Sequence, residues 1–272
     1  MEIIEIFGYI SALFIGISLG LIGGGGSILA VPVLAYLFLI DEKTATAYSL
    51  FIVGSSALVG GIKQHFKGYV DWKTAIVFGF PAIIGVTLIR HYVVPALPNV
   101  LFTIGHFEIT RRMGMFGLFA TLMIPAAFSM LNGRKGLAKA HTEKVKFNYP
   151  LILIEGLILG SVTGMIGAGG GFLIIPALVI LAKLEMKVAV GTSLIIIALN
   201  SLIGFFLGDV LVMQIDWSFL LVITSISLVG IFIGSYLGHF IDGKKLKKGF
   251  GYFIFLMAIF IFYMEFIVKS NA

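Results

Sequence analysis

The chain has 272 residues, of which 59% are hydrophobic and only 12% are charged, and its formal net charge is +6. This share of charge is about half the usual value, and with a mean hydropathy of +1.10 it excludes an ordinary soluble domain and indicates several membrane spans. The absence of cysteine excludes disulfides, thiolate metal sites and a cysteine nucleophile. The basic residues lie in short loops between apolar runs, which indicates membrane orientation rather than nucleic-acid binding.

Two of the apolar segments carry a glycine run in their middle. The first run is Gly20-Leu-Ile-Gly-Gly-Gly-Gly-Ser27, and the second is Gly164-Met-Ile-Gly-Ala-Gly-Gly-Gly171. Each glycine costs about 1 kcal/mol relative to alanine, so both helices are predicted to break there. A break at membrane depth is tolerated only where it is buried in protein or lines a wet cavity. At about 20 apolar residues per crossing, the segments in chain order are 4–40 (broken), 44–62, 74–92, 113–131, 149–183 (broken), 187–207, 215–239 and 249–268.

The two breaks form an internal repeat with an offset of 144 residues. Eight of the fifteen positions in 20–34 are identical to their counterparts in 164–178. The repeat divides the chain into a first repeat (1–131), a basic cytoplasmic linker (132–148) and a second repeat (149–272).

Each broken segment could be one kinked crossing or a hairpin that turns back. If every segment crosses once, the two sides receive 9 and 10 of the 19 basic residues, whereas two hairpins place 14 on one side and 5 on the other. Cytoplasmic loops carry the basic excess, so hairpins are favoured. The predicted fold is an all-α polytopic membrane protein made of two inverted repeats. Each repeat is a broken, re-entrant helical hairpin plus three transmembrane helices, and both termini lie outside the cell.

The breaks also predict a binding site. A helix that resumes after a break presents free N–H groups and about half a unit of positive charge. Interrupted helices at corresponding places in two inverted halves point to a transporter's binding site, here for a small anion between the hairpin tips. The alternative is that the glycines only permit tight helix packing. The candidate substrate-binding N–H groups are those of Gly24, Gly25, Gly26, Ser27, Gly169, Gly170 and Gly171.

Polar side chains follow each break at equivalent positions. Ser49 and Ser193 correspond at the same offset, and Asn200 lies about two turns after Ser193. These three side chains are candidates for hydrogen bonds to the ligand. A serine in a membrane helix also commonly bonds to its own backbone, which is the alternative for both serines.

Other chemistry has little support in the sequence. The glycine runs lack the lysine of a phosphate-binding loop, and the five histidines have no metal-ligand spacing, so neither a cofactor nor a metal site is expected. An intramembrane enzyme would need clustered Glu, Arg, Ser or His at depth, and the chain has no such cluster. Glu155 could lie inside a membrane segment and carry a coupling proton.

The duplicated break, 20–32 and 164–176, is followed in each half by a helix with the pattern Ala-x-x-x-Ser-Leu, which begins at Ala45 and at Ala189. These paired motifs resemble the sulfite exporter TauE/SafE family. The resemblance implies a secondary transporter of small anions, such as sulfite, organosulfonates or organic acids, that works as an exporter in the cytoplasmic membrane of a prokaryote. Its partners would be the anionic substrate and the lipid bilayer, with no nucleic acid. The alternative is an anion channel of the same architecture, and the anion, proton coupling and a homodimer stay open.

Overall fold

The computed structural model describes residues 3–24, 26–104, 107–131, 149–180, 182–238, 240–241 and 243–268. These residues form an almost entirely helical assembly with one two-stranded sheet, which confirms the predicted all-α polytopic class. Within these described residues, six helices are long and apolar enough to cross a membrane. They are Glu42–Phe66, Trp72–Ala96, Arg111–Leu131, Met186–Asp209, Trp217–Leu237 and Lys248–Val268.

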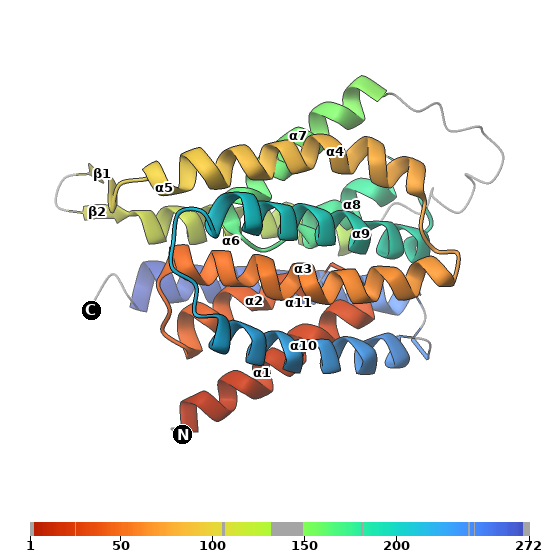
Figure 1. Ribbon diagram of the computed structural model, residues 1–272, viewed down its shortest axis with the longest axis horizontal. Helices are drawn as coiled ribbons and strands as arrows, with labels where there is room; N and C mark the ends of the chain where they lie inside the picture. The colour runs from red at the N-terminus through yellow and green to blue at the C-terminus, as the bar shows by residue number, and fades with distance from the viewer. Residues whose placement is uncertain are drawn as a thin grey trace.

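The elements follow the predicted segments closely (Figure 1). Several spans end in a π-helical turn, denoted η. In chain order they are α1 (Ile3–Ile22), α2 (Ser27–Pro32), η1 (Val33–Leu37), α3 (Glu42–Phe66), α4 (Trp72–Leu88), η2 (Ile89–Val93), α5 (Val94–Ala96), β1 (Val100–Ile104), β2 (Phe107–Thr110), α6 (Arg111–Leu131), α7 (Tyr149–Ile166), α8 (Gly171–Ile180), α9 (Met186–Gly204), η4 (Phe205–Asp209), α10 (Trp217–Leu237), α11 (Gly243–Tyr263) and η5 (Met264–Val268).

The first broken segment is a hairpin. Tyr9, near the start of α1, packs edge-on against Phe38, just after η1, with ring centroids 5.7 Å apart. The two limbs therefore start and finish at the same end of the molecule. In Figure 1 the second broken segment, α7 and α8, opens towards the opposite end. The limbs that follow the breaks begin at Ser27 and Gly171, as the glycine runs predicted.

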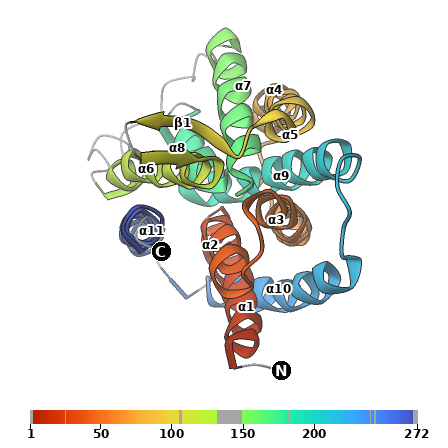
Figure 2. The same ribbon diagram turned by 90° about the vertical axis from the view of Figure 1, so that its left-hand side faces the viewer.

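Each hairpin packs against the other half of the chain. α1 lies along α10, and α7 lies along α4. A Cβ added at Gly16 would lie 2.8 Å from the carbonyl carbon of Ser227, and one at Gly160 would lie 2.7 Å from that of Ala82. Such close approach of main chains is typical of glycine in membrane helices. Figure 2 shows α3 and α9 in the middle, with the pair α4–α7 on one side and the pair α1–α10 on the other.

The outer faces of the bundle are apolar. Phe80 on α4, Phe232 on α10 and Leu256 on α11 are 65%, 54% and 65% exposed. Single exposed apolar side chains are ordinary, but a bundle that carries them on several long apolar helices is typical of contact with lipid. The predicted spans and this surface agree.

The stretch 93–112, between the predicted segments 74–92 and 113–131, contains regular structure. α5 is followed by an antiparallel hairpin in which Thr103 pairs with Glu108, with an irregular register between Val100 and Phe102. The β-branched and aromatic residues of this stretch suit paired strands. We call this end of the molecule the hairpin end.

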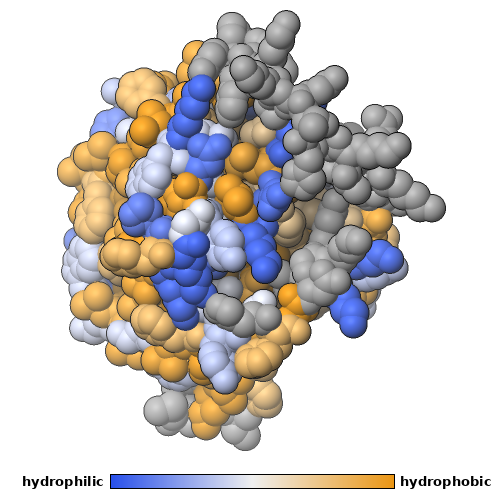
Figure 3. All heavy atoms as spheres, turned by 90° about the vertical axis from the view of Figure 1, so that its right-hand side faces the viewer, coloured by the Kyte–Doolittle hydropathy of each residue, from blue (hydrophilic) through white to orange (hydrophobic). Residues whose placement is uncertain are grey.

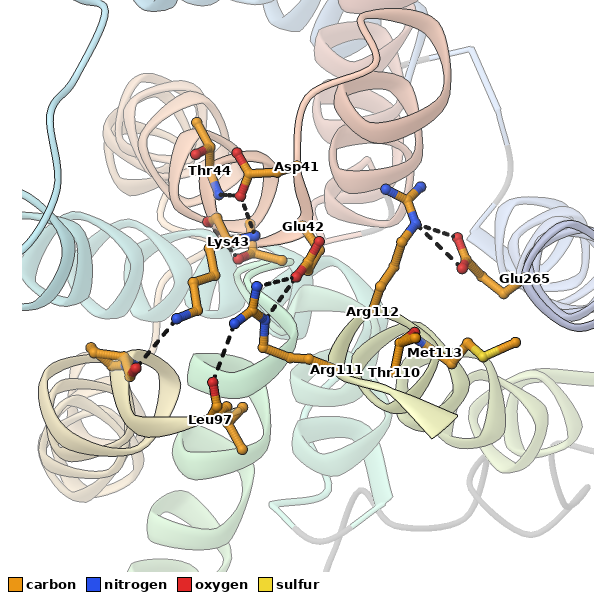
Figure 4. A network of polar contacts seen from close by, with 12 residues as sticks. Asp41, Glu42, Lys43, Thr44, Leu97, Thr110, Arg111, Arg112, Met113 and Glu265 are labelled. Atoms are coloured by element: carbon orange, nitrogen blue, oxygen red, sulfur yellow. Dashed lines mark hydrogen bonds and ion pairs between the residues drawn. The ribbon is translucent and has the colours of Figure 1, made fainter. Parts of the chain in front are cut away.

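Polar contacts tie the hairpin end together (Figure 4). Arg111 donates from Nε to Oε1 of Glu42 at 2.7 Å and from Nη1 to the carbonyl of Leu97 at 3.2 Å. Arg112 donates from Nε to Glu265 of η5 at 3.0 Å. These contacts place the start of α6 against α3 and η5, so η5 lies at the hairpin end. The start of α1 lies there too, because Tyr9 packs on Phe38, which shortly precedes α3.

The opposite end is rich in lysine, and we call it the lysine end. It contains the end of α3, the start of α4, the start of α9 and the start of α11 (Figure 1). The described lysines of these segments and their loops are Lys63, Lys67, Lys73, Lys183, Lys187, Lys245 and Lys248.

Candidate functional site

The two glycine breaks meet inside the bundle. A Cβ added at Gly24 would lie 2.5 Å from the carbonyl carbon of Gly171, and Gly171 likewise faces the Cα of Gly24. The tips therefore touch through main-chain atoms, and any side chain at either position would clash. In this conformation a ligand would have to lie beside this contact, because the two glycines leave no room between them.

Each break also packs against the central helix of the other half. Gly23 has φ +82° and lies against Val190 at the start of α9, while Gly167 has φ +73° and lies against Thr46 at the start of α3. Thr46 and Val190 are equivalent in the repeat. A positive φ is readily adopted by glycine and disfavoured for other residues, so both positions require it.

The remaining candidate glycines differ in what they face. Gly26 packs on Leu19 and Gly170 packs on Thr163, each within its own hairpin. Gly169, with φ +63°, faces other helices: its added Cβ would lie 2.8 Å from Val53 of α3 and 2.9 Å from Oγ of Ser201 on α9. The structure therefore brings Gly169, but not Gly26 or Gly170, against polar groups of the central helices. Gly25 lies outside the described residues.

Two of the candidate serines are already hydrogen-bonded within their own segment. Ser27 donates to the carbonyl of Gly24 at 2.7 Å, and Ser193 donates to the carbonyl of Val190 at 2.9 Å. For Ser193 this is the alternative that the sequence left open, a bond to its own helix backbone.

Ser49 behaves differently. Its side chain is fully buried, and its Oγ has no hydrogen-bond partner in the described part of the chain. It lies one turn after Thr46, which contacts Gly167, and one turn before Val53, which contacts Gly169. Residues three and four apart share a face of a helix. Ser49 therefore faces the second break.

Two further buried polar residues, Asn200 and Ser201, lie on α9. Both are buried, and neither the amide atoms of Asn200 nor Oγ of Ser201 has a hydrogen-bond partner among the residues that the structure describes. Ser201 lies against Gly169, and Gly204, one turn after Asn200, packs towards Leu50 and Val86. We call Ser49, Asn200 and Ser201 the polar cluster; Ser201 was not among the predicted site residues, although it directly follows Asn200.

Sequence reasoning missed a buried ion pair near the same break. Arg90 lies near the end of the predicted segment 74–92, and Asp209 lies just after the predicted segment 187–207. The structure places them in η2 and η4, 0% and 3% exposed, with Nε of Arg90 3.3 Å from Oδ2 of Asp209. The π-helical turn η4 extends its helix past the predicted end at 207, so Asp209 lies inside the helix rather than in a loop.

Glu155 and Glu265 differ in exposure and in hydrogen bonding. Glu155 lies partly exposed on α7, and its Oε2 has no hydrogen-bond partner in the described chain. Glu265 is 1% exposed and accepts hydrogen bonds from Arg112 and from the hydroxyl of Tyr36. In the residues described, no group of three or more His, Cys, Asp or Glu could hold a metal ion.

A partly open cavity of about 120 Å³ lies at the lysine end. Figure 3 looks onto this end and shows hydrophilic side chains gathered in the middle of the face. Burial, and then the neighbouring Lys63, lowers the pKa of Lys67, and the ammonium of Lys187 lies 5.9 Å from the ring of Tyr69. The cavity reaches towards the first break, since one of its lining residues, Val190, contacts Gly23. Its lining consists of Gly20, Leu21, Gln64, Lys67, Tyr69, Met186, Lys187, Val190, Ser235, Gly238 and Ile241.

A family model described as Sulfite exporter TauE/SafE matches residues 9–261. The chain belongs to the TauE/SafE family. This membership agrees with the paired glycine breaks and identifies the protein as a multi-pass membrane transporter rather than an enzyme.

Individual relatives of this TauE/SafE member carry matching descriptions. A "Probable membrane transporter protein" of Xylella fastidiosa is 31% identical over 191 residues, which cover 70% of this chain and 68% of the relative. The "Probable membrane transporter protein YunE" of Bacillus subtilis is 28% identical over 198 residues, 68% of this chain and 70% of the relative. A probable membrane transporter of Methanocaldococcus jannaschii is 37% identical over 128 residues, 43% and 48% of the two chains. No solved structure matches.

Proposed function

We propose that this TauE/SafE protein is a secondary transporter that exports small anions, sulfite, organosulfonates or organic acids, across the cytoplasmic membrane of a prokaryote. The family's description as a sulfite exporter supports the substrate class and the direction. The relatives described as membrane transporters support the general activity.

The observation that carries this proposal is the polar cluster at the second break. Leaving a buried polar group without a hydrogen bond costs about 1–3 kcal/mol, and such groups in native proteins call for an explanation. Serine hydroxyls and the amide of asparagine donate hydrogen bonds without carrying charge. A small oxyanion beside Gly169 would accept bonds from Ser49, Asn200 and Ser201.

The cavity at the lysine end gives anions an approach to the first break, which touches the second break at Gly24 and Gly171. Lysine charges around a concave surface raise the local concentration of anions and speed their association. Lys67 and Lys187 line the cavity, and Val190, which also lines it, contacts Gly23 of the first break. We assign the lysine end to the cytoplasm, since cytoplasmic loops carry the basic excess. Both termini then lie outside.

The two halves, 1–131 and 149–272, are proposed to be inverted repeats joined by a cytoplasmic linker, 132–148. The support is that α1 packs on α10 as α7 packs on α4, with equivalent glycines at both contacts. Alternating access would then come from movement of one half against the other around the touching tips.

Sidedness can be tested directly because the chain has no cysteine. Single cysteines at Lys73 and Lys245 should be labelled from one side of the membrane, and a cysteine at Glu108 from the other. Labelling of all three from the same side would contradict the proposed topology.

The function itself is tested with purified protein and a panel of sulfite, organosulfonates, carboxylates and phosphate. A ligand at 100 times its Kd stabilises the folded state by about 2.7 kcal/mol, which is measurable as a rise in Tm. We expect at least one oxyanion of the panel to raise Tm, with chloride at equal ionic strength as the control. Stabilisation by none of the anions would contradict the proposal.

The channel alternative is separated by flux into proteoliposomes. A transporter should show flux that saturates with anion concentration and responds to an imposed proton gradient. Flux that rises in proportion to concentration without saturation would favour a channel.

A further inference from the structure

Arg90 is a fully buried cation that the proposed function does not yet use. It is 0% exposed and lies within the span Trp72–Ala96. Charged residues inside membrane segments are rare, face the interior of the helix assembly and pair with other groups. The partner of Arg90 is Asp209, at the end of the span Met186–Asp209.

The guanidinium of Arg90 is only partly used. Arginine has five N–H donors. Nη1 donates to Oγ1 of Thr46 at 3.2 Å, while Nη2 has no hydrogen-bond partner in the chain as described. Nε and Oδ2 of Asp209 lie 3.3 Å apart as an ion pair, without the geometry of a hydrogen bond. Arginine and carboxylate often form two parallel hydrogen bonds, so this contact is incomplete and leaves donors for a second anionic group.

Arg90 also lies next to the second break. Its hydrogen-bond partner Thr46 would be 2.6 Å, measured at its Cα, from a Cβ added at Gly167. Thr46 precedes Ser49 of the polar cluster by one turn, on the face that contacts the break. Arg90 therefore contacts the same face of α3 that carries Ser49 of the polar cluster.

We propose that Arg90 binds the transported oxyanion directly, and that Asp209 is a resident counter-charge that the anion displaces. This assignment rests on the proposed function of anion transport. The planar guanidinium fork matches pairs of oxygens on sulfonate, sulfite or carboxylate groups. Without substrate, a lone buried cation would cost several kcal/mol, and Asp209 supplies the negative partner. When an oxyanion arrives, two negative groups compete for one guanidinium.

The local backbone provides a way to separate the pair. Arg90 lies in η2 and Asp209 in η4, and these π-helical turns contact each other. π-turns within longer helices are frequent at functional sites. Conversion of η4 to α-helical geometry would turn Asp209 around the helix by up to about 100°, one residue's rotation, and away from Arg90.

The test measures the Kd of sulfite and of an organosulfonate for the purified protein by calorimetry. Asp209→Asn removes the competing charge and keeps the shape of the side chain, so the Kd should fall about tenfold. Arg90→Lys keeps a charge but loses the fork, and the Kd should rise at least about tenfold.

Glu265→Gln serves as the matched control, because it alters an arginine–carboxylate pair at the same end of the molecule that does not contact the break. Its Kd should stay within about twofold of wild type. The double variant Arg90→Gln/Asp209→Asn leaves no lone buried charge, so it should insert and unfold like wild type but bind at least about tenfold more weakly.

Two results would overturn the assignment alone: wild-type affinity in the double variant, or weaker binding in Asp209→Asn, while wild-type protein binds the anion. If wild-type protein binds neither anion, nor any other of the oxyanion panel, the proposed function fails, and the role of Arg90 fails with it.

Discussion

The two glycine breaks have nearly the same sequence and equivalent neighbours in the opposite half, but the polar groups around them differ in their hydrogen bonding. The first break lies against Val190 and the basic cavity, and the candidate serines around it, Ser27 and Ser193, are bonded to main-chain carbonyls. The second break lies against Thr46 and faces the polar cluster, which has no partners among the described residues.

The two halves share hydrogen bonds from a main-chain N–H to a side-chain hydroxyl on the central helices. The N–H of Asp216 donates to the hydroxyl of Tyr48 at 2.7 Å, and the N–H of Asp71 donates to the hydroxyl of Thr192 at 2.9 Å. Tyr48 and Thr192 are equivalent in the repeat. The repeat thus preserves the frame that brings the breaks together, while individual side chains differ between the halves and make one break polar.

The largest effect is expected at the contact between the tips. Gly171→Ala adds a Cβ within 2.6 Å of main-chain atoms of Gly24, so the hairpins would be forced apart and transport should fall at least about a hundredfold. Gly79→Ala is the control, since its nearest neighbour would be 3.7 Å away, and it should transport normally. Normal flux in Gly171→Ala would mean that transport does not depend on this contact.

The next prediction separates the two halves. Ser49→Ala removes an unpartnered donor that faces the second break, and transport should fall about tenfold if a hydrogen bond to the anion is lost. Ser193→Ala removes a hydroxyl bonded to its own helix and should change transport less than about twofold. Equal losses in proteoliposome flux would show that the halves contribute alike.

A symmetric pair of variants should affect stability equally. Tyr48→Phe and Thr192→Val each remove a part-buried hydrogen bond to the main-chain N–H of an aspartate, at a cost of about 0.5–1.5 kcal/mol. Unfolding of the purified protein should show a similar fall in Tm for both. A fall in only one of them would show that the frames of the two halves differ in strength.

The smallest effect is expected in the cavity at the lysine end. Lys67→Gln should raise the KM for the anion about twofold at low salt, and the difference should shrink at high salt. Since burial, and then Lys63, lower the pKa of Lys67, its charge is lost at a lower pH than that of a fully solvated lysine. The wild-type KM should therefore rise with alkaline pH sooner than that of Lys67→Gln.

The sequence predicted much of the fold, because helix breaks and spans depend on local composition. Glycine runs interrupt helices wherever they occur, so the limbs beginning at Ser27 and Gly171 could be located in advance. The distribution of basic residues predicted the hairpins because cytoplasmic loops carry the basic excess. The β-hairpin at 100–110 was missed since it is short and lies beside prolines.

The site could be predicted only in part, because it depends on tertiary neighbours. Ser49 and Ser193 occupy equivalent positions, and only the packing around them distinguishes a partnered hydroxyl from an unpartnered one. Arg90 and Asp209 are 119 residues apart in the chain. No local pattern indicates that they pair, and a charge near the end of an apolar segment is indistinguishable in sequence from one in a loop.

The bare main-chain contact between Gly24 and Gly171 has a mechanical consequence. Interlocking side chains would resist sliding between two such surfaces, but Gly24 and Gly171 contact each other through main-chain atoms alone. Each atom pair across the seam contributes about 0.1–0.2 kcal/mol of dispersion, so parting a few of them costs little more than thermal energy. The two hairpins can therefore move against each other at this contact with little cost in free energy.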